Sequence, residues 1–443
     1  MSIKDIRNST YNYIEQIMTD IQAFGNRIAY TEPERQAVAY IVNEMQTLGL
    51  DVHQDEMGGI YGIRKGTNPD EPAIVFGSHT DSVPNGGNYD GLAGIVSSLA
   101  VAKNLNDRNI KTERTLVFLA MRIEESTLTG QACSNSKFIC GALKSADLDK
   151  IPLITEHPDL MDVDVLRVAT PLKTLRQAIE KADLHKGYRK LSVLEPFRWG
   201  EFYELHIEQG HTLTRENKQI GIVESIYAPR RWRMNISVPP EKSRGVHDGT
   251  TPQPDKPDAR VAATEIMFMF DLMLKQYGDE IRANIGMINI NGASMNRIPM
   301  DVDIFFSTRS SNMALRDNFV DEFLKKANAA LVLNGYEMQV EQKERGVPVI
   351  IDPDRMKTIA KASSGYTTMT MPSGAGHDAQ YLDMICENGA GVIFIPNTGE
   401  SHTPSEHCKI EDIVRGSMIQ NKIAIERGKI VARRIGEINY DKH

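Results

Sequence analysis

Apolar residues recur at helical spacing over residues 1–50, and beyond that stretch they form short runs that end in polar, glycine-rich segments. The helical spacing predicts two helices, the second of which ends at Gly49. Between the first two short runs, residues 92–105 predict a further helix. The short runs predict four buried strands, at residues 73–76, 116–121, 202–205 and 392–395. Strands that alternate with helices indicate an α/β sheet.

Each of the four predicted strands leads into a histidine or a glutamate. In open α/β sheets, ligands bind beyond the carboxyl ends of the strands. The pattern therefore predicts one cluster of chemically active side chains at a single sheet edge, made of His79, Glu125, His206 and His402.

Residues 227–345 follow a different pattern, with two amphipathic helices and several strands. The helices are predicted at 259–274 and 317–333, and the strands at 233–238, 285–290 and 301–307. About 120 residues of this kind can fold as an independent α+β unit. We therefore predict the α/β class. A mixed, largely parallel sheet with helices on both faces forms a catalytic domain over residues 1–226 and 346–443, and an inserted α+β domain covers 227–345.

Composition narrows the function classes. The 443 residues are 41% hydrophobic and 25% charged, with a net charge of −8, so no basic surface for nucleic acid is expected. The N-terminus lacks a basic segment followed by an apolar run, and no apolar stretch approaches 18 residues, so we expect neither a signal peptide nor a membrane span. Four scattered cysteines without a CxxC pair favour a reducing cytoplasm over disulfides or a zinc knuckle.

The segment Gly77–Val83 and the glycine-rich turn after it carry the most specific pattern. His79 offers an imidazole nitrogen, and Asp90 offers a carboxylate that can bridge two cations. Glycines allow the turn to fold back over the strand end. An HxD pair by itself is weak evidence, because Asp81 can orient His79 in a purely structural hydrogen bond.

Three further segments strengthen the metal interpretation. Glu124 and Glu125 are adjacent carboxylates at a strand end, where a cation relieves their repulsion; the alternative is a solvated acidic turn. His206 and Glu208 alternate on one strand face, and His402 lies in a polar turn, where a lone histidine is as often structural. Together, three histidines and two carboxylates suit two borderline ions, zinc first, with manganese, cobalt or nickel as substitutes.

Two such ions can lower the pKa of a shared water to about 7, and Glu124 can take its proton and pass it to the leaving nitrogen. The chain has no GxSxG elbow, no P-loop, no GxGxxG after a strand and no recognisable cysteine nucleophile. The residues thus favour metal-dependent hydrolysis of an amide.

These segments resemble the hydantoinase/carbamoylase branch of the dinuclear-zinc aminoacylase and carboxypeptidase superfamily. That branch holds N-carbamoyl-L-amino acid hydrolases, allantoate and ureidoglycolate amidohydrolases and β-ureidopropionases. The matching stretches span residues 77–406 and read GSHTDSVPNGGNYDG, the EE pair, ELHIEQG, HDGTTP, SGAGHDA and IPNTGESHTPSE. HIEQG and GAGHDA distinguish the branch from its peptidase relatives.

The resemblance implies a role for each matching residue. His79 and His206 would share one ion with bridging Asp90, while Glu125 and His402 would hold the other. Glu124 would be the general base. Outside the metal ligands, the inserted domain would be a lid and the site of homodimerisation, and His247 would stabilise the oxyanion in a neighbouring subunit's site. The residues implied in substrate binding are Asn296 and Arg309, which would grip a carboxylate, and Gln209, Gly376 and His377, which would line the pocket.

Some positions depart from the pattern of the branch. Ser126–Thr129 replaces the usual Ser-Arg-Phe, Arg122 replaces an asparagine, Asp248 and Gln253 are unusual, and Ser237–Pro240 lacks a glycine. The expected substrate is a small carboxylate with an N-carbamoyl (ureido) group. An N-acyl amino acid hydrolase or dipeptidase is the alternative that Ser126–Thr129 favours, and a non-catalytic ligand-binding protein is a third. Without the resemblance, Arg309 could equally form a surface ion pair.

Overall fold

A computed structural model describes residues 2–153, 172–182, 192–193, 197–242, 247–253 and 256–431. The chain divides into two compact units. Unit 1 spans Met1–Glu224 and Ile351–His443, and unit 2 spans Ser225–Ile350. Each unit has its own sheet and its own buried core.

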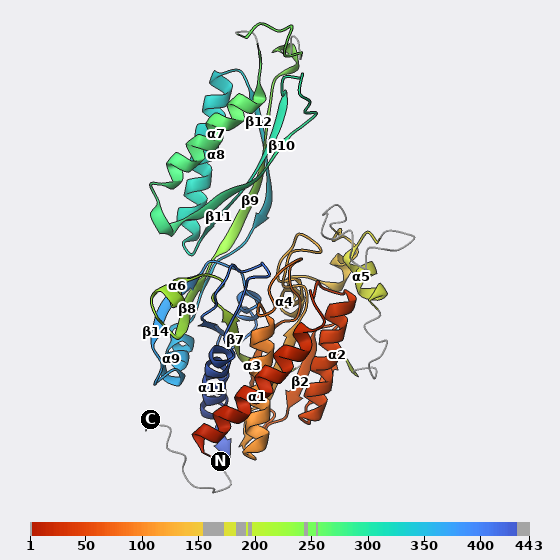
Figure 1. Cartoon of the computed structure of the whole chain (residues 1–443), viewed down its shortest axis with the longest axis vertical. Helices are drawn as coiled ribbons and strands as arrows, with labels where there is room; N and C mark the ends of the chain where they lie inside the picture. Colours follow the sequence, from red (N-terminus) through yellow and green to blue (C-terminus); the bar gives the residue numbers. More distant parts are fainter. Residues whose placement is uncertain are drawn as a thin grey trace. The chain divides into compact units, whose positions relative to one another are not determined.

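The larger sheet has ten strands among the described residues and belongs mainly to unit 1 (Figure 1). Its order is β13-β8-β15-β7-β3-β5-β2-β1-β6, and β14 also pairs with β8. The central strands β15, β7, β3 and β5 are parallel, while β8 and β2 flank them antiparallel. The strands are β1 (Asp51–Gln54), β2 (Ile60–Arg64), β3 (Ala73–His79), β5 (Leu116–Met121), β6 (Ser192–Val193), β7 (Trp199–Ile207), β8 (Ile220–Ile226), β13 (Val349–Ile350), β14 (Thr368–Ser373) and β15 (Ala390–Ile395). The predicted mixed α/β sheet is confirmed.

The helices of unit 1 surround this sheet. They are α1 (Ile3–Gln22), α2 (Glu32–Thr47), α3 (Leu92–Asp107), α4 (Ser134–Ile139), α5 (Leu175–Lys181), α6 (Thr212–Arg215), α9 (Pro353–Ala362), α10 (Ala379–Leu382) and α11 (Ile410–Arg427). A small separate sheet pairs β4 (Lys111–Thr112) with β16 (Ile430–Val431). α1 begins with a capping box, in which Ser2 and Asp5 satisfy each other's backbone amides. No described helix is long and apolar enough to cross a membrane.

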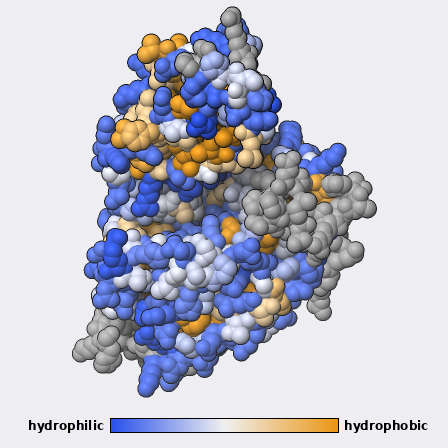
Figure 2. Space-filling model, turned by 45° about the horizontal axis from the view of Figure 1, so that its top comes forward, coloured by the Kyte–Doolittle hydropathy of each residue, from blue (hydrophilic) through white to orange (hydrophobic). Residues whose placement is uncertain are grey.

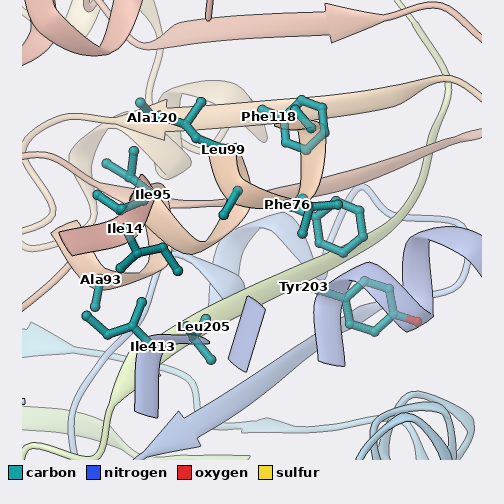
Figure 3. Packing of buried hydrophobic residues seen from close by; sticks show 14 of the residues in the cluster. Ile14, Phe76, Ala93, Ile95, Leu99, Phe118, Ala120, Tyr203, Leu205 and Ile413 are labelled. Atoms are coloured by element: carbon teal, nitrogen blue, oxygen red, sulfur yellow. The ribbon is translucent and has the colours of Figure 1, made fainter. Parts of the chain in front are cut away.

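The main core fills one face of the central strands. Phe118, Phe76 and Tyr203 stack across β5, β3 and β7, with ring centroids 6.2 and 5.9 Å apart, and residues of α3 and α11 pack against that row (Figure 3). The close approach of α3 to β7 depends on Gly94, because a Cβ there would lie 2.2 Å from the carbonyl oxygen of Leu205. Strands buried on both faces read as continuous apolar runs, which is why the sequence revealed them.

Unit 2 is a four-stranded sheet with two long helices on it. The sheet order is β10-β11-β9-β12, all antiparallel neighbours. The helices α7 and α8 lie side by side on the sheet (Figure 1) and bury a cluster around Phe270, Phe306 and Phe323. The elements are β9 (Ala228–Ser237), α7 (Ala259–Leu274), β10 (Arg282–Ile290), β11 (Asp301–Ser310), α8 (Met313–Leu333) and β12 (Glu337–Arg345).

Candidate metal centre

Asp90 lies between two groups of possible metal ligands in unit 1. Its Oδ1 atom is 3.0 Å from Nε2 of His206 and 3.3 Å from Nε2 of His79. Its Oδ2 atom is 3.3 Å from Nε2 of His402, and that nitrogen is 3.3 Å from Oε1 of Glu125. Each oxygen of one carboxylate therefore faces a different group, which is the arrangement that a bridge between two ions needs.

The spacing of these donor atoms fits two ions. Two ligands that bind zinc tetrahedrally at about 2.0–2.1 Å lie about 3.3–3.4 Å from each other. The donor distances around Asp90 fall between 3.0 and 3.3 Å. Oδ1 of Asp90 is also buried without a hydrogen-bond partner among the described residues, as expected of an oxygen that receives a cation.

The end of β3 brings His79 and Asp90 together. His79 is 1% exposed, and its Nδ1 atom lies 3.0 Å from the backbone oxygen of Asp81, which turns Nε2 toward Asp90. The chain returns to this point through Gly91, whose φ is +65°. A Cβ at Gly91 would lie 2.5 Å from the carbonyl oxygen of His79, so the close return requires glycine.

Asp81 also holds the turn that carries the two glutamates. Its Oδ1 and Oδ2 atoms accept hydrogen bonds, both 3.1 Å, from the backbone amides of Glu124 and Glu125. The preceding Ile123 has φ +54°, a strained conformation for a β-branched residue. Asp81 therefore does more than orient His79, because it also fixes the position of the Glu124–Glu125 backbone.

Glu124 lies beside the two groups of ligands without belonging to either. Burial raises the pKa of Glu124 well above its ordinary value, and the nearby Glu125 carboxylate raises it further against the lowering effect of His79. The thiol of Cys133, also buried, donates a hydrogen bond of 3.1 Å to Oε1 of Glu124. A carboxyl with a raised pKa can both accept and release a proton near neutral pH.

His206 has two further neighbours that the sequence did not single out as a pair, Glu204 on the same face of β7 and His377 in the turn before α10. Glu204 and His377 form a third possible ligand group with His206. Glu204 accepts hydrogen bonds from Ser78 Oγ and the backbone amide of Ala379, which already occupy both carboxylate oxygens. The two-residue spacing to His206 was the available signal for Glu204.

Gln209 and His377 are the predicted pocket residues that contact this centre. Gln209 has φ +61° and donates from Nε2 to Oδ2 of Asp90 at 2.6 Å. The ring of His377 lies 4.6 Å from that of His206, and burial together with this neighbour lowers the pKa of His377 well below its ordinary value. Gly376 precedes His377 in the turn before α10.

Glu208, on the same strand face as His206 in the sequence pattern, belongs to none of the possible ligand groups among the described residues. Its carboxylate caps α6, because it accepts hydrogen bonds from the backbone amides of Thr212 and Leu213.

Glu406 organises the loop that presents His402. One of its oxygens accepts from the backbone amide of Asp90 at 3.2 Å, and the other accepts from Ser401 Oγ at 3.0 Å and from the amide of His402 at 3.4 Å. His402 itself has φ +61°. The last residue of the SHTPSE segment thus ties the loop to Asp90, a role that the sequence did not reveal.

The remaining predicted residues belong to unit 2 and lie at two ends of one strand. His247 bridges Arg297, and the amide of Asp248 donates to the backbone oxygen of Asn296, so His247 and Asn296 are neighbours before β11. Arg309 lies near the other end of β11, opposite Arg282. Eight residues of strand between Asp301 and Arg309 span about 27 Å.

Comparison with known proteins is consistent with this centre. The model of peptidase family M20/M25/M40 matches residues 75–426. An N-carbamoyl-L-amino-acid amidohydrolase of Paenarthrobacter aurescens is 28% identical and covers 89% of this chain and 90% of its own length. An allantoate amidohydrolase of Bacillus subtilis is 27% identical and covers 93% of this chain and 95% of its own length. The resemblance to the hydantoinase/carbamoylase branch is confirmed.

A solved structure supports the fold. A hydantoinase/carbamoylase family amidase from Burkholderia multivorans superposes with a TM-score of 0.80. It covers 94% of this chain and 98% of its own, at 24% sequence identity. At that identity the likeness establishes the architecture, and the chemistry has to be argued from the residues.

Proposed function

Since the chain belongs to peptidase family M20/M25/M40, we propose that it is a metal-dependent hydrolase of linear, non-peptide C–N bonds. The substrate is a small carboxylate with an N-carbamoyl (ureido) group on its nitrogen, such as an N-carbamoyl-L-amino acid or an allantoate-type compound. The names of the relatives, N-carbamoyl-L-amino-acid and allantoate amidohydrolase, support this class. Family membership alone would also allow a peptidase.

One observation carries the proposal: Asp90 lies between two groups of ligands with Glu124 beside them. His79 and His206 would hold one ion with Asp90, and Glu125 and His402 would hold the other with the same carboxylate. Imidazole and carboxylate donors suit zinc best, with manganese, cobalt or nickel as substitutes. When bound, the ions supply Lewis acidity and lower the pKa of water.

Glu124 moves the proton in this scheme. Its Oε atoms accept a proton from the attacking water and return it to the leaving nitrogen. Burial raises the pKa of Glu124, which stabilises the protonated form that returns the proton to the leaving nitrogen. Cys133 holds Oε1 by its thiol hydrogen bond, so the carboxylate is kept in one orientation.

The substrate-binding roles follow from the family resemblance. In unit 1, Gln209, Gly376 and His377 line the pocket, and a neutral His377 offers a hydrogen bond without adding charge. In unit 2, Arg309 grips the substrate carboxylate, since a guanidinium fork binds a carboxylate with two parallel hydrogen bonds, and Asn296 would add its contact in the site of a second subunit.

We expect purified enzyme to carry close to two ions per chain and to hydrolyse ureido carboxylates. Metal analysis followed by a panel of N-carbamoyl amino acids, allantoate and N-acetyl amino acids tests this. Ureido substrates can release ammonia and N-acetyl substrates cannot, so an ammonia assay separates the classes. Activity should disappear after chelation and return when zinc or manganese is added. Full metal loading without turnover of any panel member would contradict the substrate class.

An N-acyl amino acid hydrolase is the second candidate, and Leu128 is the observation in its favour. The position follows the Glu124–Glu125 pair, where the branch carries a cation and an aromatic residue. Here Leu128 is 1% exposed and packs in an apolar cluster with Tyr30 and Met57. An apolar residue in place of the cation removes a charged group from this segment, and that loss favours an acyl group over a ureido group.

We further propose that the enzyme is a homodimer formed through unit 2. β10 is an edge strand with exposed Met287, Ile288 and Ile290, and an unpaired edge of this kind favours pairing with another chain. α7 packs next to β10 and exposes Phe268 and Leu272. Figure 2 shows hydrophobic side chains gathered on the surface of unit 2. A second copy that pairs β10 with β10 would cover this surface.

The geometry of β11 supports a site shared between subunits. His247 and Asn296 lie at its Asp301 end and Arg309 near the other, about 27 Å away along the strand. One substrate is too small to touch both ends of that strand. If all three residues contact substrate, they serve different sites, and a dimer supplies the second site.

Disrupting the β10–α7 surface should halve the mass in solution. We expect the double variant Phe268→Glu/Ile288→Arg to elute as a monomer in size exclusion with light scattering, and to lose most activity if the site is shared. Val332→Glu/Leu333→Glu, at exposed apolar positions on α8, is the matched control and should remain dimeric. A dimeric Phe268→Glu/Ile288→Arg variant would place the interface elsewhere.

Subunit sharing can be tested by complementation. Chains with His247→Ala and chains with Glu124→Gln are each expected to be inactive. Mixed and re-formed heterodimers should regain partial activity, because one of the two sites then has both residues intact. Heterodimers that form without any recovery would argue against a shared site.

We also propose a cytoplasmic location. The four cysteines are all free in the structure, and three of them are buried. Free thiols persist in a reducing compartment, whereas extracellular chains usually pair them.

A further inference from the structure

A cavity in unit 1, of about 250 Å³, lies at the base of the loop that presents His402. Three segments line it: residues 213–219 around α6, residues 396–398 after β15, and residues 407–415 at the start of α11. None of the proposed metal ligands lines this cavity. Its volume is below the roughly 300–1,000 Å³ of pockets for drug-sized molecules, so it suits a small ligand.

The charges that line the cavity favour an anion. Lys218, Lys409 and Arg415 line it together with a single acid, Asp412. Arg415 forms an ion pair with Asp412, so the positive excess comes from the two lysines. Within the part of the chain that the structure describes, neither lysine ammonium has a hydrogen-bond or ion-pair partner. The chain as a whole has a net charge of −8, so this local excess is not a consequence of composition.

A further polar group in the wall lacks a partner. Asn397 is 1% exposed and lines the cavity, and its Nδ2 atom has no hydrogen-bond acceptor among the described residues. Buried amide groups are normally satisfied, so an orphaned donor here is consistent with a polar ligand or water nearby.

The cavity wall is connected to the metal centre. Thr398 and His407 pair through two backbone hydrogen bonds of 2.7 and 2.8 Å and close the loop that holds His402. On the other side, Oδ1 of Asn397 accepts from the backbone amide of Gln209 at 3.0 Å, and Gln209 contacts Asp90. A ligand that bridges Lys218 and Lys409 would therefore link the segment after α6 to the end of the loop that presents His402.

We propose that this cavity is an effector site for a small oxyanion, a phosphate or a carboxylate, separate from the substrate pocket. Binding ties the end of the His402 loop, at Lys409, to the segment after α6, at Lys218, and so tightens the hold on the ion that His402 would ligate. Coupling between two sites is reciprocal, so metal loading also strengthens anion binding. Only the coupling rests on the proposed function, because the anion site itself does not require the metal.

Calorimetric titration of the metal-loaded enzyme with inorganic phosphate, and separately with succinate, tests the site. The wild type should bind at least one of them with a dissociation constant of about 1 mM or tighter. Lys218→Met/Lys409→Met should weaken that binding at least tenfold and keep its activity on substrate. Lys275→Met/Lys325→Met, two exposed lysines of unit 2, is the matched control and should bind like the wild type. The stronger of the two anions identifies the ligand class.

The same titrations can overturn the proposal. Binding that is equal in the wild type and in Lys218→Met/Lys409→Met would place the anion at the metal ions instead. Absence of binding to both anions at about ten times the expected dissociation constant would exclude the site. Single Lys218→Gln and Lys409→Gln variants give the same comparison if the double variant unfolds. Neither outcome bears on hydrolysis, which the substrate panel measures without added anion.

Discussion

Replacing Glu124 by glutamine should lower kcat by about 10²–10⁴-fold and leave both metal ions in place. The amide has nearly the shape of the carboxylate and can still accept the thiol hydrogen bond of Cys133, but it cannot take a proton from water. Glu124 belongs to neither group of ligands around Asp90, so its loss should not release metal. Metal analysis and steady-state kinetics on the same preparation measure the two quantities together.

The control for Glu124→Gln is Glu216→Gln, the same chemical change at an exposed position after α6. It should have no effect on kcat or on metal content. If Glu124→Gln keeps two ions and its kcat falls less than tenfold, another group is the base. If the wild type turns over no substrate of the panel, a non-catalytic ligand-binding protein becomes the better interpretation.

The sequence predicted the elements whose pattern is set by burial. β3, β5, β7 and β15 are apolar runs buried on both faces, and α7 runs over the same residues as predicted. β12 was not predicted, because its sequence EMQVEQKER is polar and it lies at a sheet edge. Edge strands carry few apolar residues by which periodicity can reveal them.

The candidate centre was predictable only in part, for a physical reason. Strand order brings His79 and His206 to one edge, and that much follows from the α/β pattern. The position of Asp90 between two groups depends on a turn of positive φ at Gly91, which the pattern does not reveal. The contacts of Glu406 and Asn397 join segments that are far apart along the chain, so local sequence gives no signal for them.

Arg122, which departs from the asparagine common in the branch, has a partner that sequence could not identify. It lies two residues before Glu124 and forms a buried ion pair with Glu34 of α2, 88 residues away. The two side chains are 2% and 0% exposed, and the guanidinium lies 4.4 Å from the ring of Tyr30. Glu34 also accepts from Thr80, the neighbour of His79. This pair therefore joins α2 to both strand ends of the centre.

Removing one member of this pair should destabilise unit 1 strongly. Arg122→Met leaves Glu34 as a buried, uncompensated carboxylate and should lower the free energy of unfolding by about 3–5 kcal/mol. The double variant Glu34→Leu/Arg122→Met should lose much less free energy of unfolding, because it removes both charges. Each unit contains one tryptophan, so urea titration in a Trp232→Phe background follows unit 1 through Trp199 alone.

A solvent-exposed ion pair in the same unit provides the comparison for Arg122→Met. Nη2 of Arg198 lies 2.9 Å from Oε2 of Glu387, and the two side chains are 63% and 42% exposed. Arg198→Met should therefore lower the free energy of unfolding by about 1 kcal/mol or less. An equal decrease in the free energy of unfolding for Arg122→Met and Arg198→Met would mean that the buried carboxylate of Glu34 is protonated or hydrated once its partner is gone. In that case the pair contributes to the position of Glu124 rather than to stability, and kcat of Arg122→Met should fall while unfolding is little changed.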